Sequence, residues 1–107
     1  MDKSGDRVST ALNEAVAFLR GQIDVAAVIL FGSQLTGRTH EHSDIDIAVF
    51  SPDIANLRLV ERANLAARLR LSCGLELEPH FYPDTYLEDP PDATLVKQIV
   101  ETGRRIV

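Results

Sequence analysis

Two short groups of residues in this sequence have the types and spacing to act on a phosphate ester. They are Gly32-Ser33 and, after ten intervening residues, Asp44 and Asp46. A glycine lets the backbone turn sharply and approach a ligand closely, and the free N–H groups at the start of a helical turn bind phosphate oxygens. Two carboxylates on one face repel each other unless a cation lies between them, and Mg²⁺ binds carboxylates together with phosphate oxygens. The combination predicts nucleotidyl transfer.

Two consecutive strands are expected to hold these groups. The apolar, β-branched run Val25–Phe31 predicts a strand that is buried on both faces and ends at Gly32, where a short helical turn follows from Ser33. The alternating run Asp44–Phe50 predicts the next strand. With a period of two, its aspartates point to one face, and its isoleucines and Val49 point to the other, into a core.

One segment resembles a known family signature: residues 32–50, GSQLTGRTHEHSDIDIAVF. In the minimal nucleotidyltransferase domains of the DNA polymerase β-like superfamily, Gly-Ser is likewise followed after ten residues by Asp-x-Asp. The resemblance implies an α/β (α+β) nucleotidyltransferase fold, a small mixed β-sheet with helices packed on it. It also implies ATP as the substrate and two Mg²⁺ ions, held by Asp44, Asp46 and a third carboxylate.

The same resemblance assigns the triphosphate to the loop between the two strands. Many relatives have an arginine where this chain has Thr36, and Arg38 is expected to supply that charge. The residues expected to bind the triphosphate are Gly32, Ser33, Arg38 and Ser43.

The third carboxylate is expected on the alternating run Leu75–Tyr82, which predicts a strand. Glu76 and Glu78 share one face of this strand with His80, so both glutamates are candidates. Because Pro79 lacks the N–H that a strand ladder needs, the strand is expected at a sheet edge or deformed there. Glu-Pro-His also resembles the third-carboxylate strand of some minimal nucleotidyltransferases. We therefore prefer Glu78 over Glu76, as a metal ligand or as the base for the acceptor hydroxyl.

The rest of the chain predicts helices that pack on this sheet. A first helix is expected at about residues 7–21, a second from Ser51-Pro52-Asp53 to a stop at Gly74, and a third at about residues 92–102. Arg105–Val107 is expected to form a last strand. The second helix is expected to bury residues that recur at helical spacing, namely Leu57, Val60, Ala63, Ala67 and Leu71.

Length and composition bound the function. At 107 residues and 45% apolar content, the chain is expected to form a single domain over residues 1–107. A net charge of −5 without a long Lys/Arg run argues against binding of bulk nucleic acid. The lone Cys73 excludes an internal disulfide, and the N-terminus has no apolar segment for a signal peptide or membrane span. The expected location is the cytoplasm, as part of a homo- or hetero-oligomer.

Larger superfamily members carry an extra domain that binds the acceptor, and we expect none in a chain of this length. Free-standing domains of this size resemble the antitoxin half of HEPN/MNT toxin–antitoxin pairs, in which the nucleotidyltransferase adenylylates a tyrosine of a helical HEPN ribonuclease. The resemblance therefore implies transfer of AMP from ATP to a tyrosine hydroxyl of such a partner. Two alternatives stay open. One is a weak or inactive nucleotide-binding module that masks its partner by contact, and the other is a transferase for a small hydroxyl compound or RNA.

Overall fold

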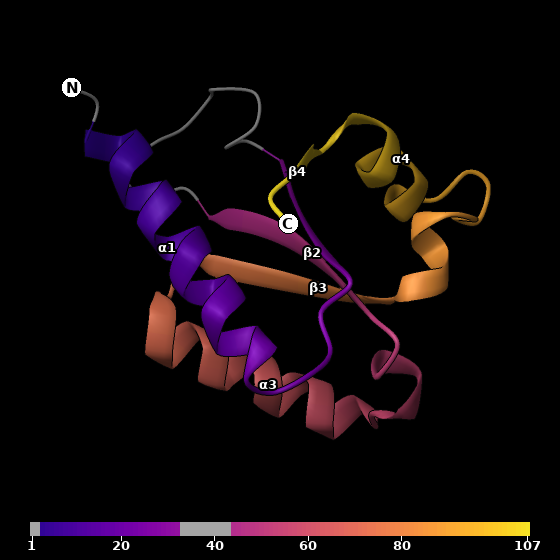
Figure 1. Cartoon of the computed structure of the whole chain (residues 1–107), viewed down its shortest axis with the longest axis horizontal. Helices are drawn as coiled ribbons and strands as arrows, with labels where there is room; N and C mark the ends of the chain where they lie inside the picture. The colour runs from indigo at the N-terminus through magenta and orange to yellow at the C-terminus, as the bar shows by residue number, and fades with distance from the viewer. Residues whose placement is uncertain (1–2, 33–43) are drawn as a thin grey trace.

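The computed structural model describes residues 3–32 and 44–107. The helices and strands in these residues appear along the chain in Figure 1. They are α1 (Lys3–Arg20), β1 (Ala27–Phe31), β2 (Ile45–Ser51), the 3₁₀ turn η1 (Ile54–Asn56), α3 (Leu59–Cys73), β3 (Leu77–Pro83), the 3₁₀ turn η2 (Asp84–Leu87), α4 (Leu95–Thr102) and β4 (Arg104–Arg105).

The strands form one mixed sheet in the order β3-β2-β1-β4. β1 runs antiparallel to both β2 and β4, whereas β2 and β3 are parallel. A parallel pair needs a crossover connection, and α3 with the preceding turn supplies it. The expected mixed sheet with helices packed on it is thus confirmed. β3 lies at the edge, as the proline in this strand predicted, because an edge strand tolerates a missing N–H.

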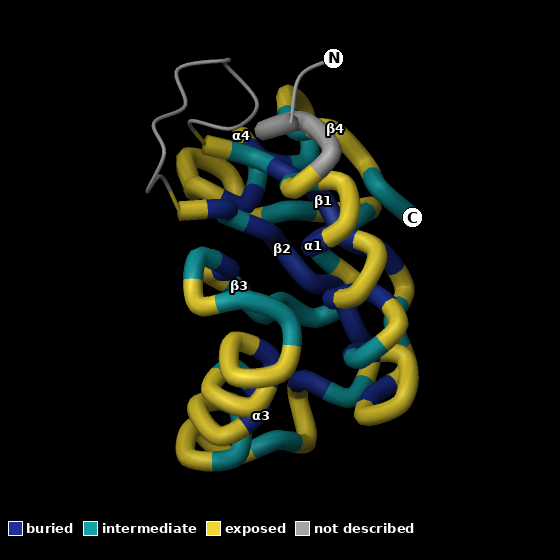
Figure 2. The backbone as a smooth tube through the Cα atoms, turned by 90° about the vertical axis from the view of Figure 1, so that its left-hand side faces the viewer, coloured by how far each residue is buried: buried dark blue, intermediate teal, exposed yellow. Residues whose placement is uncertain are grey.

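Helices cover both faces of the sheet. α1 and α3 pack on the face that receives the isoleucines of β2, whereas α4 and η2 pack on the face that receives Ala48 and Phe50. Figure 2 shows the buried residues concentrated in β1 and β2, between these layers, with the edge strand β3 less buried. Burial of β1 on both faces is confirmed, since Ala27, Val28 and Ile29 are each buried. None of the described helices is long and apolar enough to cross a membrane.

Helix α1 matches the sequence prediction on its buried side, although it begins earlier, at Lys3. Its apolar residues recur every three or four positions, so they align along one stripe that faces the sheet. The residues that enter the core are Ala11, Leu12, Ala15, Val16 and Leu19.

The prediction for the start of the second helix was wrong. β2 extends through Ser51, and η1 and a break at Arg58 precede α3. A residue before proline is disfavoured in helical conformation, and Ser51 precedes Pro52. The buried Ser51 hydroxyl also accepts the N–H of Asp53 at 3.0 Å, which closes a turn. α3 then begins where the N–H of Arg58 donates to Glu61 Oε1 at 3.0 Å.

The predicted buried stripe of this helix was wrong at four of its five residues, since only Leu57, which precedes α3, packs against the core. The side chains that α3 buries in the core are Leu65 and Leu69, which are 3% and 0% exposed. Val60 and Leu71 are instead 55% and 79% exposed, and Ala63 and Ala67 also face solvent. Two sets of apolar residues in α3 have helical spacing, and periodicity alone does not say which set meets the sheet.

The remaining boundaries shifted by a few residues. β3 begins at Leu77, and the residues before it form a turn that leaves Leu75 65% exposed. α4 begins after Thr94, whose hydroxyl accepts the N–H of Lys97 at 3.3 Å. The final strand is shorter than predicted. The chain still continues beside β1, because the N–H of Ile106 donates to the Val28 carbonyl at 2.7 Å.

Candidate active site

Two carboxylates and an imidazole meet on the face of the sheet that α4 and η2 cover. Asp46 of β2 pairs with Glu78 of the parallel strand β3, and His80 follows two residues later on the same face. Ligand atoms of the three side chains all lie within 4.8 Å of one another. His80 Nε2 lies 3.6 Å from Asp46 Oδ1, and this buried nitrogen has no hydrogen-bond partner among the described residues. We call Asp46, Glu78 and His80 the carboxylate cluster.

The end of β1 closes one side of the cluster. Phe31 pairs with Asp46 across the antiparallel ladder, and its ring meets the His80 ring edge-on at 5.1 Å between centroids. Gly32 comes next, with φ of +82°. A Cβ at Gly32 would lie 2.5 Å from Asp46 Oδ2, so only glycine lets the backbone pass the carboxylate here. The first residue of the predicted phosphate loop therefore lies against the carboxylate cluster.

The charges in the cluster repel one another. A side-chain hydrogen bond with Asp46, followed by partial burial and the negative charges of Asp46 and Asp44, raises the pKa of Glu78 above its ordinary value, and His80 opposes this. Asp44 directly precedes β2, at an exposed position, and its charge reaches Glu78. Carboxylate oxygens with one imidazole are donors that suit a divalent cation, which would relieve this repulsion.

The structure separates the two glutamates that the sequence left open. Glu78 lies beside Asp46, whereas Glu76 lies in the turn before β3 and forms an ion pair with Arg7 at 3.9 Å. His80 also belongs to the cluster, and the signal for its place there was the strand face that the sequence predicted it to share with Glu78. The predicted triphosphate ligands Ser33, Arg38 and Ser43 lie outside the described residues.

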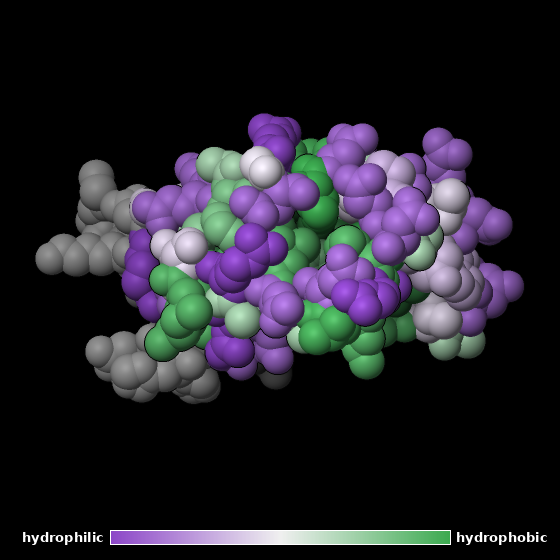
Figure 3. All heavy atoms as spheres, turned by 90° about the horizontal axis from the view of Figure 1, so that it is seen from below, coloured by the Kyte–Doolittle hydropathy of each residue, from purple (hydrophilic) through white to green (hydrophobic). Residues whose placement is uncertain are grey.

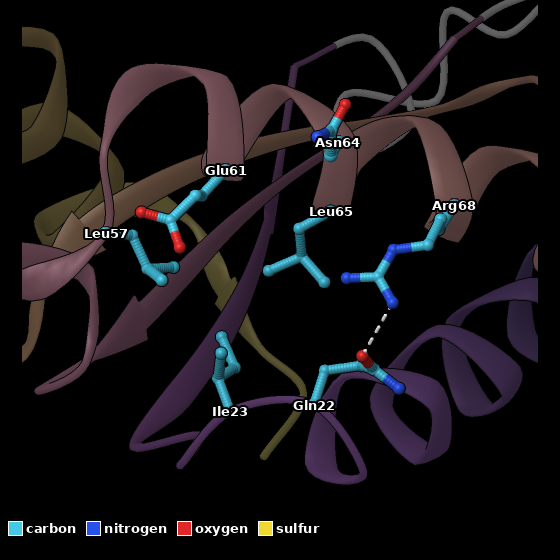
Figure 4. Close-up of a pocket in the computed structure, with 7 residues that line it drawn as sticks. All are labelled: Gln22, Ile23, Leu57, Glu61, Asn64, Leu65 and Arg68. Carbon is cyan, nitrogen blue, oxygen red and sulfur yellow. Dashed lines mark hydrogen bonds between the residues drawn. The ribbon is translucent and has the colours of Figure 1, made fainter.

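A separate pocket of about 190 Å³ lies on the other face of the sheet, between α3 and the segment after α1 (Figure 4). Its floor is formed by Ile23, Leu57 and Leu65. Glu61 and Arg68 of α3 stand at its rim. This pocket has no residue in common with the carboxylate cluster, and nothing in the sequence reasoning predicted it.

Comparison with known proteins identifies the family. The family described as "Polymerase beta, Nucleotidyltransferase" matches residues 13–107. No curated protein matches the chain. A mixed sheet that carries paired carboxylates beside a glycine turn, together with this match over most of the chain, defines the class: the chain belongs to the polymerase β nucleotidyltransferase family.

Within that class the chain is similar to solved toxin–antitoxin structures. One, crystallised with AMP-PNP, is 32% identical, with a TM-score of 0.61, over 87% of this chain and 69% of that chain. The MntA–HepT toxin–antitoxin is 28% identical, with a TM-score of 0.56, over 89% of this chain and 68% of that chain. A third structure, a mutant of the toxin–antitoxin MntA–HpeT, is 29% identical, with a TM-score of 0.59, over 87% of this chain and 69% of that chain.

Proposed function

We propose that this chain, as one domain of residues 1–107, transfers AMP from ATP to a tyrosine hydroxyl of a helical partner protein and so acts as the antitoxin of a HEPN-type toxin. The observation that carries the proposal is the pairing of Asp46 with Glu78 on adjacent strands, next to the glycine that follows β1. The similarity to a toxin–antitoxin structure with AMP-PNP supports the choice of nucleotide and of partner class.

In this proposal the acidic residues hold metal and the glycine turn holds phosphate. Asp44, Asp46 and Glu78 bind Mg²⁺, and Gly32 approaches the triphosphate through its backbone, with Ser33, Arg38 and Ser43 completing that site. Mg²⁺, when bound, supplies positive charge that stabilises the phosphate oxygens. His80 Nε2, which lies 3.6 Å from Asp46 Oδ1 and has no hydrogen-bond partner among the described residues, is a further donor that a bound cation could use.

The transfer itself is an in-line displacement. The acceptor oxygen forms a bond to the α-phosphorus, the bond from this phosphorus to the β-phosphate oxygen breaks, and pyrophosphate leaves with the electron pair. The hydroxyl proton passes to the Glu78 carboxylate. The phenol of tyrosine, with a pKa of about 10, yields its proton more readily than the hydroxyl of serine or threonine.

The exposure of the cluster supports an acceptor that comes from another molecule. Glu78 is exposed, and the side chains of Asp46 and His80 are 23% and 34% exposed. The Glu78 carboxylate is therefore accessible from solvent to a hydroxyl group that a partner brings.

Intact mass spectrometry tests the proposal. The chain is co-expressed with its candidate helical partner, purified, and incubated with ATP and Mg²⁺. The partner is expected to gain AMP increments, and Asp46→Asn is expected to abolish them. Glu76→Gln is the matched control, because Glu76 is an acidic neighbour of β3 outside the cluster, and it is expected to retain transfer. If the partner binds and is inhibited but gains no mass, the proposal of an enzyme is wrong, and the alternative of a module that masks its partner by contact is favoured.

A further inference from the structure

The imidazole of His80 lies in the carboxylate cluster with its Nε2 atom buried. This nitrogen has no hydrogen-bond partner among the described residues, and buried polar side-chain atoms ordinarily have one. The Phe31 ring packs edge-on against the imidazole, with 5.1 Å between the ring centroids and 62° between the planes. This contact and the pairing of His80 with Ala48 of β2 fix where the ring lies. Nε2 therefore needs a partner from outside the described residues.

The distance from this nitrogen to Asp46 suits two ligands of one ion better than a hydrogen bond. His80 Nε2 lies 3.6 Å from Asp46 Oδ1. A hydrogen bond between a nitrogen and an oxygen atom rarely spans more than about 3.2 Å. Two donors that share an ion at bond lengths of about 2.0–2.2 Å lie roughly 2.8–3.6 Å apart. Glu78 also offers an oxygen, and the ligand atoms of all three side chains lie within 4.8 Å of one another. The cluster thus has three donors, one of which is nitrogen.

We propose that His80, Asp46 and Glu78 together hold one metal ion, and that the nitrogen of His80 makes this position prefer a transition-metal ion, such as Fe²⁺ or Zn²⁺, to Mg²⁺. The inference rests on the metal site of the proposed function and names the class of ion that one position of that site selects. Mg²⁺ binds oxygen donors, retains several waters and loses them reluctantly. Imidazole nitrogen suits Fe²⁺, Ni²⁺, Cu²⁺ and Zn²⁺ instead. A site of carboxylates alone lacks this means of discrimination.

The two oxygens of the Asp46 carboxylate face different neighbours. Oδ1 faces His80, whereas Oδ2 is the atom that a Cβ at Gly32 would approach to 2.5 Å. An ion held by His80 and Glu78 therefore lies on the β3 side of Asp46, and the glycine turn with its proposed phosphate lies on the β1 side. Since three protein side chains hold this ion, we expect it to bind to the free chain before any nucleotide does.

The rest of the described surface offers little competition for such an ion. The side of the molecule where α3 lies, seen in Figure 3, mixes hydrophilic and apolar side chains. α3 contributes a single carboxylate, Glu61, whose Oε1 accepts the Nε–H of Arg58 at 3.1 Å. Within residues 3–32 and 44–107, Asp46, Glu78 and His80 form the one group of three potential ligands close enough to share an ion.

Calorimetric titration of the full chain without nucleotide tests the preference, with Co²⁺ as the probe and Mg²⁺ as the comparison. Co²⁺ is expected to bind to the wild type roughly 100-fold more tightly than Mg²⁺. His80→Gln keeps a neutral side chain with an oxygen donor, so the affinity for Co²⁺ should fall by about tenfold or more, and that for Mg²⁺ should change by less than about threefold. Glu76→Gln is the matched control, because Glu76 lies outside the cluster, and both affinities should stay as in the wild type.

Proton NMR of the Co²⁺-loaded chain identifies the ligand directly, because the paramagnetic ion shifts the ring protons of a coordinated histidine far outside their ordinary range. Such signals are expected in the wild type and in Glu76→Gln, and they should be absent from His80→Gln. Shifted signals that persist in His80→Gln, or an equal loss of affinity for both ions in that variant, would overturn the inference. Transfer of AMP with Mg²⁺, measured by mass, would still stand in that case. If neither ion binds to the wild type, both the inference and the metal site of the proposed function are wrong.

Discussion

Asp46 and Glu78 stand side by side on two parallel strands, at a register position that forces their charges together. The pairing follows from the sheet, since β2 and β3 are in register over seven consecutive residue pairs, which keeps both side chains on one face. A hydrogen bond with the Asp46 side chain, partial burial and the negative charges of Asp46 and Asp44 together raise the pKa of Glu78. A cation between the two carboxylates would relieve the repulsion between them.

Divalent cations are therefore expected to stabilise the folded chain. Binding to the native state alone adds about 2.7 kcal/mol to the free energy of unfolding at a free concentration roughly 100 times Kd. Thermal unfolding with added Mg²⁺ or Mn²⁺ measures this, and EDTA is expected to reverse it. Asp46→Asn is expected to lose most of the increase, and Glu76→Gln to keep it. An equal increase in wild type and Asp46→Asn would exclude the carboxylate cluster as the metal site.

In the metal-free protein, the raised pKa of Glu78 should make the free energy of unfolding depend on pH. Because the pKa of Glu78 is raised above 4.5, the folded chain holds this proton more tightly than the unfolded chain does. Its contribution to stability is therefore full below pH 4.5 and is lost as pH rises through the raised value. Glu78→Gln removes the contribution, so its free energy of unfolding should gain on that of the wild type as pH rises. Urea unfolding at several pH values measures the free energy of unfolding of both proteins. If the value for Glu78→Gln minus the value for the wild type stays constant or falls as pH rises, the assignment is contradicted.

Gly32→Ala is expected to damage both the turn and the metal site. A left-handed backbone with φ of +82° costs a non-glycine residue about 1 kcal/mol or more, and the new Cβ would lie 2.5 Å from Asp46 Oδ2. The carboxylate must move, so metal-induced stabilisation should fall along with basal stability. Gly21→Ala is the control, because its Cβ would approach no atom closer than the Phe18 carbonyl oxygen at 3.4 Å. If Gly32→Ala folds and Mg²⁺ stabilises it as much as it stabilises the wild type, the turn at Gly32 does not contribute to the metal site.

The sequence predicts the parts of this fold that depend on local pattern. The stripe of α1 and the double-sided burial of β1 follow from periodicity, since each has only one apolar arrangement. The choice between Glu76 and Glu78 depends on where β3 begins, and pairing with β2 decides this. The place of His80 against Asp46 likewise depends on strand register, which no local pattern contains.

Helix α3 shows most clearly that periodicity alone does not identify the buried face of a helix. One pair of substitutions tests which face is buried. Leu69 is fully buried, so Leu69→Ala should cost about 2–5 kcal/mol through lost burial and the cavity left behind. Leu71 is 79% exposed, so Leu71→Ala should change the free energy of unfolding of the monomer by no more than about 0.5 kcal/mol. Urea unfolding at low protein concentration measures both. A large stability loss in Leu71→Ala would mean that Leu71 packs within the chain itself, as the sequence first suggested.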